Sequence, residues 1–203
     1  MRIKKVGGDM TRQTKNISEK LVDTVANRIV IPVTESTEPA LAASLTLFVT
    51  VSNEQRTVKL PIRVVDIATK LGLIVESLPL DEGLDGMLIK DKPNQPFKAV
   101  YNCYQPTVRQ RFTLAHEIGH YIRQYQEWPV DKITAEPEHR DRNSSLGFDP
   151  NEIWANGFAA ALLMPAPIVR KYWAEGKTDA DMAKKFEVSE SSMTFRRTNL
   201  GLF

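Results

Sequence analysis

The segment RQRFTLAHEIGHYI, residues 109–122, contains the pattern His-Glu-x-x-His at His116, Glu117 and His120. Residues four apart on an α-helix lie on the same face, so both imidazoles would project to one side. Such a pair can bind one zinc ion at nitrogen–zinc distances of about 2.0–2.1 Å. Glu117 would lie about 100° further round the axis, beside the ion. The segment therefore predicts a helix with His116 and His120 as metal ligands and Glu117 as the general base.

The alternative for this segment is a helix that carries two partly buried histidines and a solvated glutamate. The chain has three histidines among 203 residues, and two of them fall in this one pattern. Random order would produce such a pattern with a probability of about 0.003. We therefore favour the metal-binding interpretation.

A catalytic zinc ion also needs a third protein ligand and an open position for water. Three candidates lie in a charged segment that is typical of solvated surface: Glu136, Glu138 and His139. Glu152 is better placed, because it precedes small residues that would let its helix approach the histidine-bearing helix. Those small residues are Ala155, Asn156 and Ala159.

A structural role competes for Glu152. Asp149 and Glu152 also fit a capping box, in which the Glu152 side chain would bond a backbone N–H at the start of the helix. Pro150 suits the first helical position there. Spacing alone leaves the ligand and the cap interpretations of Glu152 open.

A second segment, EIWANGFAAALLMP at residues 152–165, follows the first in a specific order. Together they resemble the ImmA/IrrE family of metallopeptidases, whose pattern couples RFTxAHExGH with E-x-x-A-N-x-F-A-x-x-L-L-M-P. The resemblance covers about residues 60–200. It implies that Glu152 is the third metal ligand. Ala161 departs from the relatives, which often carry an acidic residue there, but this is not a ligand position.

The resemblance also implies a zinc-dependent intracellular endopeptidase that cleaves a helix-turn-helix transcriptional repressor, as part of mobile-element or stress regulation. The alternative is a toxin-like or regulatory binding partner of an antitoxin or repressor, with a metal site that is not proteolytic. An intact Glu117 favours hydrolysis, because a structural zinc site needs no general base. Two histidines and a carboxylate accept manganese as well as zinc.

The expected fold class is α+β, a minimal zincin-like metallopeptidase with a small antiparallel sheet packed on helices that include the His-Glu-x-x-His helix. Strands are predicted at residues 73–77, 87–90 and 97–102. Helices are predicted at 15–31 and 64–71, from Thr107, from Pro150 to a stop before Pro165 and Pro167, and at 178–186 and 189–198. The apolar window after Pro39 fits a helix or a strand, and we favour a helix over 40–47. Thr107 and Gln110 would form a capping box. The strand at 97–102 could pair with an extended substrate by edge addition.

We expect three parts along the chain: an N-terminal helical arm (1–35), a zincin-like metallopeptidase domain (36–176) and a C-terminal helix-turn-helix-like hairpin (177–203). Such a hairpin either binds DNA or packs onto the peptidase. Its apolar residues are Met182, Phe186, Val188, Met193 and Leu200. Mixed local charge favours packing, so direct nucleic-acid binding is not expected.

Composition sets further limits. The 27 basic and 25 acidic residues give a formal charge of +2, which argues against nucleic acid or an anionic membrane as the main partner. Cys103 is the sole cysteine, so an intramolecular disulfide and a four-cysteine zinc site are excluded. The N-terminus lacks the apolar stretch of a secretory signal, and the most apolar window, residues 40–51, is shorter than a spanning helix. We expect a cytoplasmic protein.

A residue that stabilises the oxyanion in the proposed hydrolysis remains unassigned. Four residues near the histidine motif could supply the second hydrogen-bond donor that such reactions use. They are Tyr101, Tyr104, Arg111 and Tyr121. Nothing in the sequence chooses among them.

Overall fold

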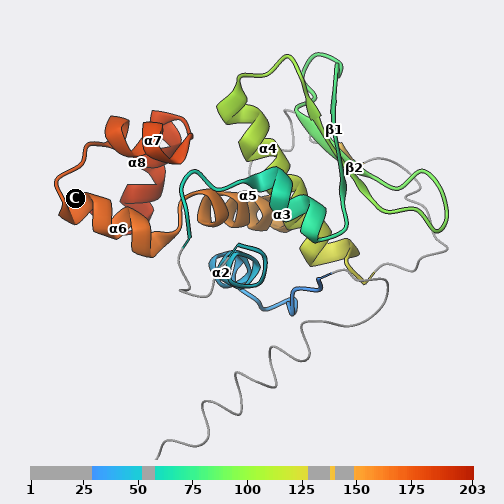
Figure 1. The fold of residues 1–203 in the computed structure, drawn as a ribbon, viewed down its shortest axis with the longest axis horizontal. Helices are drawn as coiled ribbons and strands as arrows, with labels where there is room; N and C mark the ends of the chain where they lie inside the picture. Colours follow the sequence, from blue (N-terminus) through green and yellow to red (C-terminus); the bar gives the residue numbers. More distant parts are fainter. Residues whose placement is uncertain (1–28, 52–57, 128–137, 140–148) are drawn as a thin grey trace, which may run out of the picture.

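The computed structural model describes residues 29–51, 58–127, 138–139 and 149–203. The helices within these ranges are α2 (Pro39–Thr50), α3 (Val64–Lys70), α4 (Thr107–His120), the π-helical turn η1 (Tyr121–Tyr125), α5 (Pro150–Leu163), α6 (Ala166–Ala174), α7 (Asp179–Phe186) and α8 (Glu190–Asn199). The strands are β1 (Ile74–Leu78), β2 (Gly86–Ile89), β3 (Lys98–Asn102) and β4 (Glu138–His139). Helices around one small sheet give the predicted α+β class (Figure 1).

Most of the predicted elements form close to their expected bounds. The helix predicted over 15–31 lies outside the described residues except for 29–31, which are not helical. Helix α6 is not among the predicted helices, because Pro165 and Pro167 predict the end of the helix that begins at Pro150. Pro167 instead occupies the first turn of α6, where its missing N–H costs no hydrogen bond.

The predicted capping box at the start of α4 is wrong. Pro106 is the N-cap residue and no side chain caps the helix, so Thr107 is already helical. The Gln110 side-chain amide instead donates to the backbone oxygens of Cys103 and Gln105, at 3.1 and 2.8 Å. Gln110 therefore stabilises the loop before α4 rather than the first turn of α4.

The sheet has the order β1-β3-β2-β4, in which β1 pairs with β3 in parallel and the other two pairings are antiparallel. The prediction of an antiparallel sheet is therefore wrong for β1. Asn102 at the end of β3 gives the physical reason. Its side-chain amide donates to the backbone oxygens of Leu80 and Leu84. These bonds hold the connection between β1 and β2 across the end of β3, so β2 pairs with β3 on the side opposite β1.

This order also removes the proposed role of residues 97–102 as an edge for substrate. Strand β3 is flanked by hydrogen-bonded neighbours on both sides, so its backbone groups are already paired. Edge addition requires a free row of such groups. Among the described strands, only β1 and β4 lie at the edges of the sheet.

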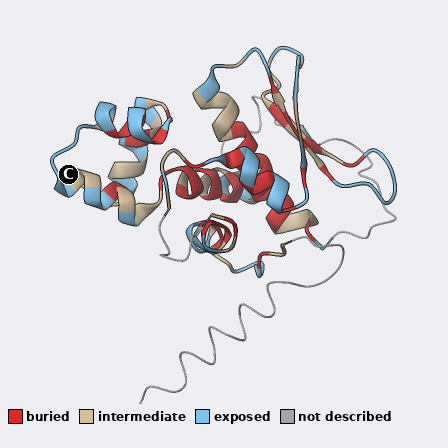
Figure 2. Ribbon diagram, in the orientation of Figure 1, coloured by how far each residue is buried: buried red, intermediate tan, exposed pale blue. Residues whose placement is uncertain are grey.

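Helix α5 lies at the centre of the molecule, between α2 on one side and α4 on the other, and α4 separates it from the sheet (Figure 1). The buried residues concentrate on α5 and on the C-terminal half of α4 (Figure 2). Gly119 allows the two helices to approach closely, because a Cβ there would lie 3.1 Å from Phe158 Cδ1 and 3.3 Å from Ala155 Cα. The small residues at this crossing set the distance between the two helices.

The C-terminal helices α6, α7 and α8 gather at one end of α5 (Figure 1). Side chains of α7, α8 and their connecting turn, namely Met182, Phe186, Val188 and Met193, are buried in the same hydrophobic cluster as α3, α4 and α5. Arg111 of α4 donates to the backbone oxygen of Glu187 at 3.2 Å, and Arg196 donates to that of Met164 at 3.1 Å. These contacts agree with packing of the hairpin, while the exact boundaries of the three parts stay predictions.

Among the described residues, no single helix has both the length and the apolar character needed to cross a bilayer. Helices α5 and α6 would reach that length only together, and the chain bends by 52° between them.

Candidate metal centre

The two histidines of the His-Glu-x-x-His motif meet on one face of α4, as the spacing predicted. His116 is fully buried and His120 nearly so. Their Nε2 atoms lie 2.8 Å apart, with the ring planes inclined by 70°. Two imidazole nitrogens therefore point at the same small volume between α4 and α5.

Glu152 reaches this volume from the first turn of α5. Its Oε1 lies 3.0 Å from His120 Nε2 and its Oε2 lies 3.3 Å from His116 Nε2. The cap interpretation does not describe this side chain, because Asp149 alone caps α5 by accepting from the N–H of Asn151 at 2.8 Å. Glu152 is thus available to a metal ion rather than to the backbone.

The other sequence candidates for a third ligand lie outside what the structure describes. Glu136 and the side chains of Glu138 and His139 are not in the described part of the chain. The backbone of residues 138–139 forms β4, paired with Met87 and Leu88 of β2.

The donor set fits a zinc ion. The candidate ligand atoms of His116, His120 and Glu152 all lie within 4.8 Å of one another. Ligand atoms of a tetrahedral zinc ion, each about 2.0–2.2 Å from the metal, lie about 3.4 Å apart. The separations of 2.8, 3.0 and 3.3 Å are close to this value, so a small outward movement of the side chains would accommodate the ion.

The outer nitrogens of both rings have amide partners. His116 Nδ1 lies 3.1 Å from Asn156 Oδ1, and His120 Nδ1 lies 3.3 Å from Gln124 Oε1. An amide oxygen accepts, so with a cation bound this arrangement would place the proton on each Nδ1 and direct each Nε2 lone pair to the cation.

These two amides were not recognised from the sequence as parts of the site. Asn156 was noted only as a small residue, and Gln124 lies in the turn η1, whose π-helical form could not be anticipated. Single π-helical turns occur frequently at functional sites. The available signal was spacing, because Asn156 follows Glu152 by four residues and Gln124 follows His120 by four.

The carboxyl group of Glu152 is stabilised as an anion. Partial burial by itself raises the pKa of Glu152, but the hydrogen bonds from His116 and His120 outweigh that effect. The pKa of this carboxyl therefore lies well below its ordinary value. An anionic carboxylate between two imidazoles is a suitable partner for a divalent cation.

Glu117 lies on the side of α4 that faces the sheet. It is 2% exposed, and a Cβ added at Gly86 of β2 would lie 3.4 Å from Glu117 Oε1. The same Cβ would lie 2.3 Å from Thr113 Cγ2 and 2.7 Å from the backbone oxygen of Val100. Glycine at position 86 therefore lets β2 approach the helix and enclose the Glu117 carboxylate.

The four residues considered for stabilising the oxyanion lie in different parts of the structure. Arg111 donates to the backbone oxygens of Ile62 and Glu187, so its guanidinium holds the hairpin. Tyr121 is buried and packs edge-on against Phe97. Tyr104 is highly exposed and Tyr101 is half-buried in β3. No contact of these groups in the described residues assigns the role.

Comparison with known proteins identifies the family of this chain. Residues 93–198 match the model of the peptidase family described as the IrrE N-terminal-like domain. The chain is similar to the radiation response metalloprotease IrrE of Deinococcus radiodurans, with 36% identity over 94 residues. That match covers 44% of this chain and 27% of the relative, so the chain spans about a quarter of the relative's length. The chain belongs to the IrrE N-terminal-like family of metallopeptidases, also known as ImmA/IrrE.

Proposed function

We propose that this protein is a zinc-dependent endopeptidase in which His116, His120 and Glu152 bind the metal and Glu117 is the general base. One observation carries the proposal: three ligating side chains from two helices converge, with a buried glutamate next to one of the histidines. Membership of a metallopeptidase family supports it. Manganese is the alternative metal, since this ligand set accepts either ion.

The proposed chemistry is hydrolysis of a peptide bond. A bound zinc ion would lower the pKa of a water molecule and polarise the scissile carbonyl. Glu117 takes the proton from the attacking water and then donates it to the departing amine. Asn156 and Gln124 hold the imidazole rings in orientation through their Nδ1 atoms. The surrounding apolar core limits access of bulk water to these groups.

The proposed substrate is a helix-turn-helix transcriptional repressor, cleaved in the cytoplasm during a stress response or the induction of a mobile element. The relative's name, a radiation response metalloprotease, is compatible with a stress role. Cleavage of a repressor would release the genes that it blocks. The DNA-binding role of the hairpin is not adopted, because Met182, Phe186, Val188 and Met193 pack it into the core of the peptidase.

The test compares the zinc-loaded protein with Glu117→Gln, using a repressor encoded beside this gene and unfolded casein as substrates. We expect Glu117→Gln to retain one zinc per chain and to lose about 10²–10⁴-fold in the rate constant for cleavage, because it cannot accept the proton. Mass spectrometry of the products and metal analysis provide the two measurements. A parallel manganese-loaded sample distinguishes the metals.

Two results would contradict the proposal. Equal cleavage by the wild type and Glu117→Gln would exclude Glu117 as the base. Tight repressor binding without cleavage by either form would instead support the alternative role as a toxin-like binding partner.

A further inference from the structure

A cavity of about 560 Å³ lies between α4, α5 and α8. Much of its lining is apolar, from Phe112, Ile153, Ala160, Met164 and Phe195. Its described lining contains no carboxylate. Cavities of about 300–1,000 Å³ with apolar walls are typical of ligand sites. This one is large enough for a leucine, methionine or phenylalanine side chain.

The cavity adjoins the candidate metal centre at Asn156. Asn156 lines the cavity, and its Oδ1 lies 3.1 Å from His116 Nδ1. Phe112 lies one helical turn before His116 on α4, and Ile153 directly follows Glu152 on α5. One turn of helix is about 5.4 Å, so a side chain in the cavity would lie within a residue or two of a bond placed at the metal.

Two of the lining side chains are exposed although they are large and apolar. Ile153 is 55% exposed and Phe195 is 68% exposed. They come from different helices, α5 and α8, yet border the same cavity. Apolar surface that faces a hollow, rather than being scattered singly, marks a binding site.

We infer that this cavity is a specificity pocket, which accepts a large apolar side chain of the peptide substrate beside the scissile bond. Phe195 of α8 is its specificity-determining residue. The inference rests on the proposed peptidase function and deepens it, because it defines the substrate class as peptides with a large apolar residue near the cleavage site. It also gives the C-terminal hairpin a role, since α8 supplies one wall of the pocket.

The test measures binding rather than turnover. Two peptidyl hydroxamates, identical except for leucine or glycine at the residue next to the metal-binding group, are titrated calorimetrically into zinc-loaded Glu117→Gln protein. We expect the leucine compound to bind at least about tenfold more tightly, as one apolar group in a pocket discriminates about 10–200-fold. Adding Phe195→Ala should remove most of this preference and leave the glycine compound unchanged.

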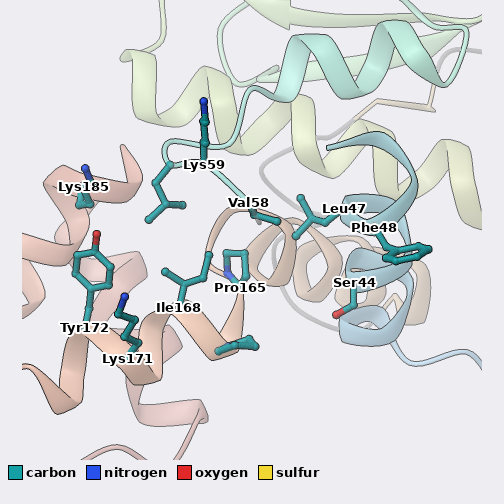
Figure 3. Close-up of a pocket in the computed structure, with 12 residues that line it drawn as sticks. Ser44, Leu47, Phe48, Val58, Lys59, Pro165, Ile168, Lys171, Tyr172 and Lys185 are labelled. Carbon is teal, nitrogen blue, oxygen red and sulfur yellow. The ribbon is translucent and has the colours of Figure 1, made fainter. Parts of the chain in front are cut away.

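Phe48→Ala is the matched control. Phe48 is also an exposed phenylalanine, at 46%, but it borders a separate groove between α2 and α6 together with Lys59, Lys171 and Lys185 (Figure 3). The leucine preference should be the same with and without this substitution. Ile153→Ala is a second test from the opposite wall, which should reduce the preference in the same direction even where Phe195→Ala fails to fold.

The outcomes separate the pocket from the peptidase function. An absent leucine preference, or one that Phe195→Ala and Ile153→Ala leave intact, overturns the inference. An equal loss in Phe48→Ala also overturns it. Wild-type protein that cleaves no substrate, combined with a leucine preference that depends on Phe195, contradicts only the proposed function. Cleavage without any apolar preference contradicts only the pocket.

Discussion

The helix pairs α4–α5 and α7–α8 differ in the kind of side chain that they bury. The α4–α5 pair carries two histidines and two glutamates in or against the core, and the close contact of the two helices depends on Gly119. The α7–α8 pair buries apolar side chains, and its charged residues are intermediate or exposed. There Asp179 pairs with Arg197, and Thr178 and Asp181 form a complete capping box.

This difference indicates what each pair is built for. Buried polar and charged groups cost free energy unless they are paired or bind a metal. The imidazoles of the α4–α5 pair have amide partners, and the proposed cation would offset the remaining cost of burial. The α7–α8 pair has helix caps and the Asp179–Arg197 ion pair of its own. Helix α8 can therefore form a rigid wall of the cavity.

The largest expected effect follows from removing the proposed ligand Glu152 from the α4–α5 pair. Glu152→Ala should lower the zinc affinity more than about 100-fold, because outer-sphere partners alone contribute about 10–100-fold. Asp149→Ala is the control, since it removes the helix cap three residues away. It should cost about 1 kcal/mol in the free energy of unfolding and leave zinc affinity unchanged. Competition with a chromophoric chelator measures the zinc affinity of the two variants. Equal losses of zinc affinity would restore the cap interpretation of Glu152.

A smaller effect is expected from the amide that orients His116. Asn156→Ala should lower the zinc affinity about 10–100-fold, because His116 Nδ1 loses its acceptor and the ring its orientation. Asn151→Ala on the same helix is the control, as its backbone rather than its side chain contacts the cap. The same chelator competition applies. Unchanged affinity in Asn156→Ala would mean that packing alone orients His116.

The smallest effect is expected in the α7–α8 pair, where Asp179 accepts hydrogen bonds from Arg197 and Thr194 at 2.8 and 2.9 Å. Burial raises the pKa of Asp179, but these bonds outweigh it and lower the pKa below its ordinary value of 3.8. The interaction of Asp179 with Arg197 and Thr194 thus stabilises the fold above about pH 4. This contribution is lost as the pH falls through the lowered pKa of Asp179.

Asp179→Asn should therefore cost about 1 kcal/mol near neutral pH and progressively less in acid. Urea unfolding at about pH 7 and about pH 3 measures this difference. Zinc affinity should not change. A loss of zinc affinity comparable to that of Asn156→Ala would show that the two helix pairs are not energetically separate.

Local sequence patterns were sufficient for most of the elements. The apolar periodicity and the turn residues predicted α2, α3 and three strands, because helices and strands are set by backbone preferences over a few residues. The histidine pair was predictable for the same reason, since four residues on a helix fix which face both side chains share. The hairpin helices α7 and α8 were also recognisable from their apolar spacing and their caps.

Only the tertiary structure decided the contacts between distant residues. The approach of Glu152 to both imidazoles, the contact of Asn156 with His116 across 40 positions, the parallel pairing of β1 with β3 and the cavity beside Phe195 all required it. Each depends on how close two elements approach, and that distance is set by packing at positions such as Gly119 and Gly86. A sequence specifies the side chains that a site can use, whereas packing determines which of them meet.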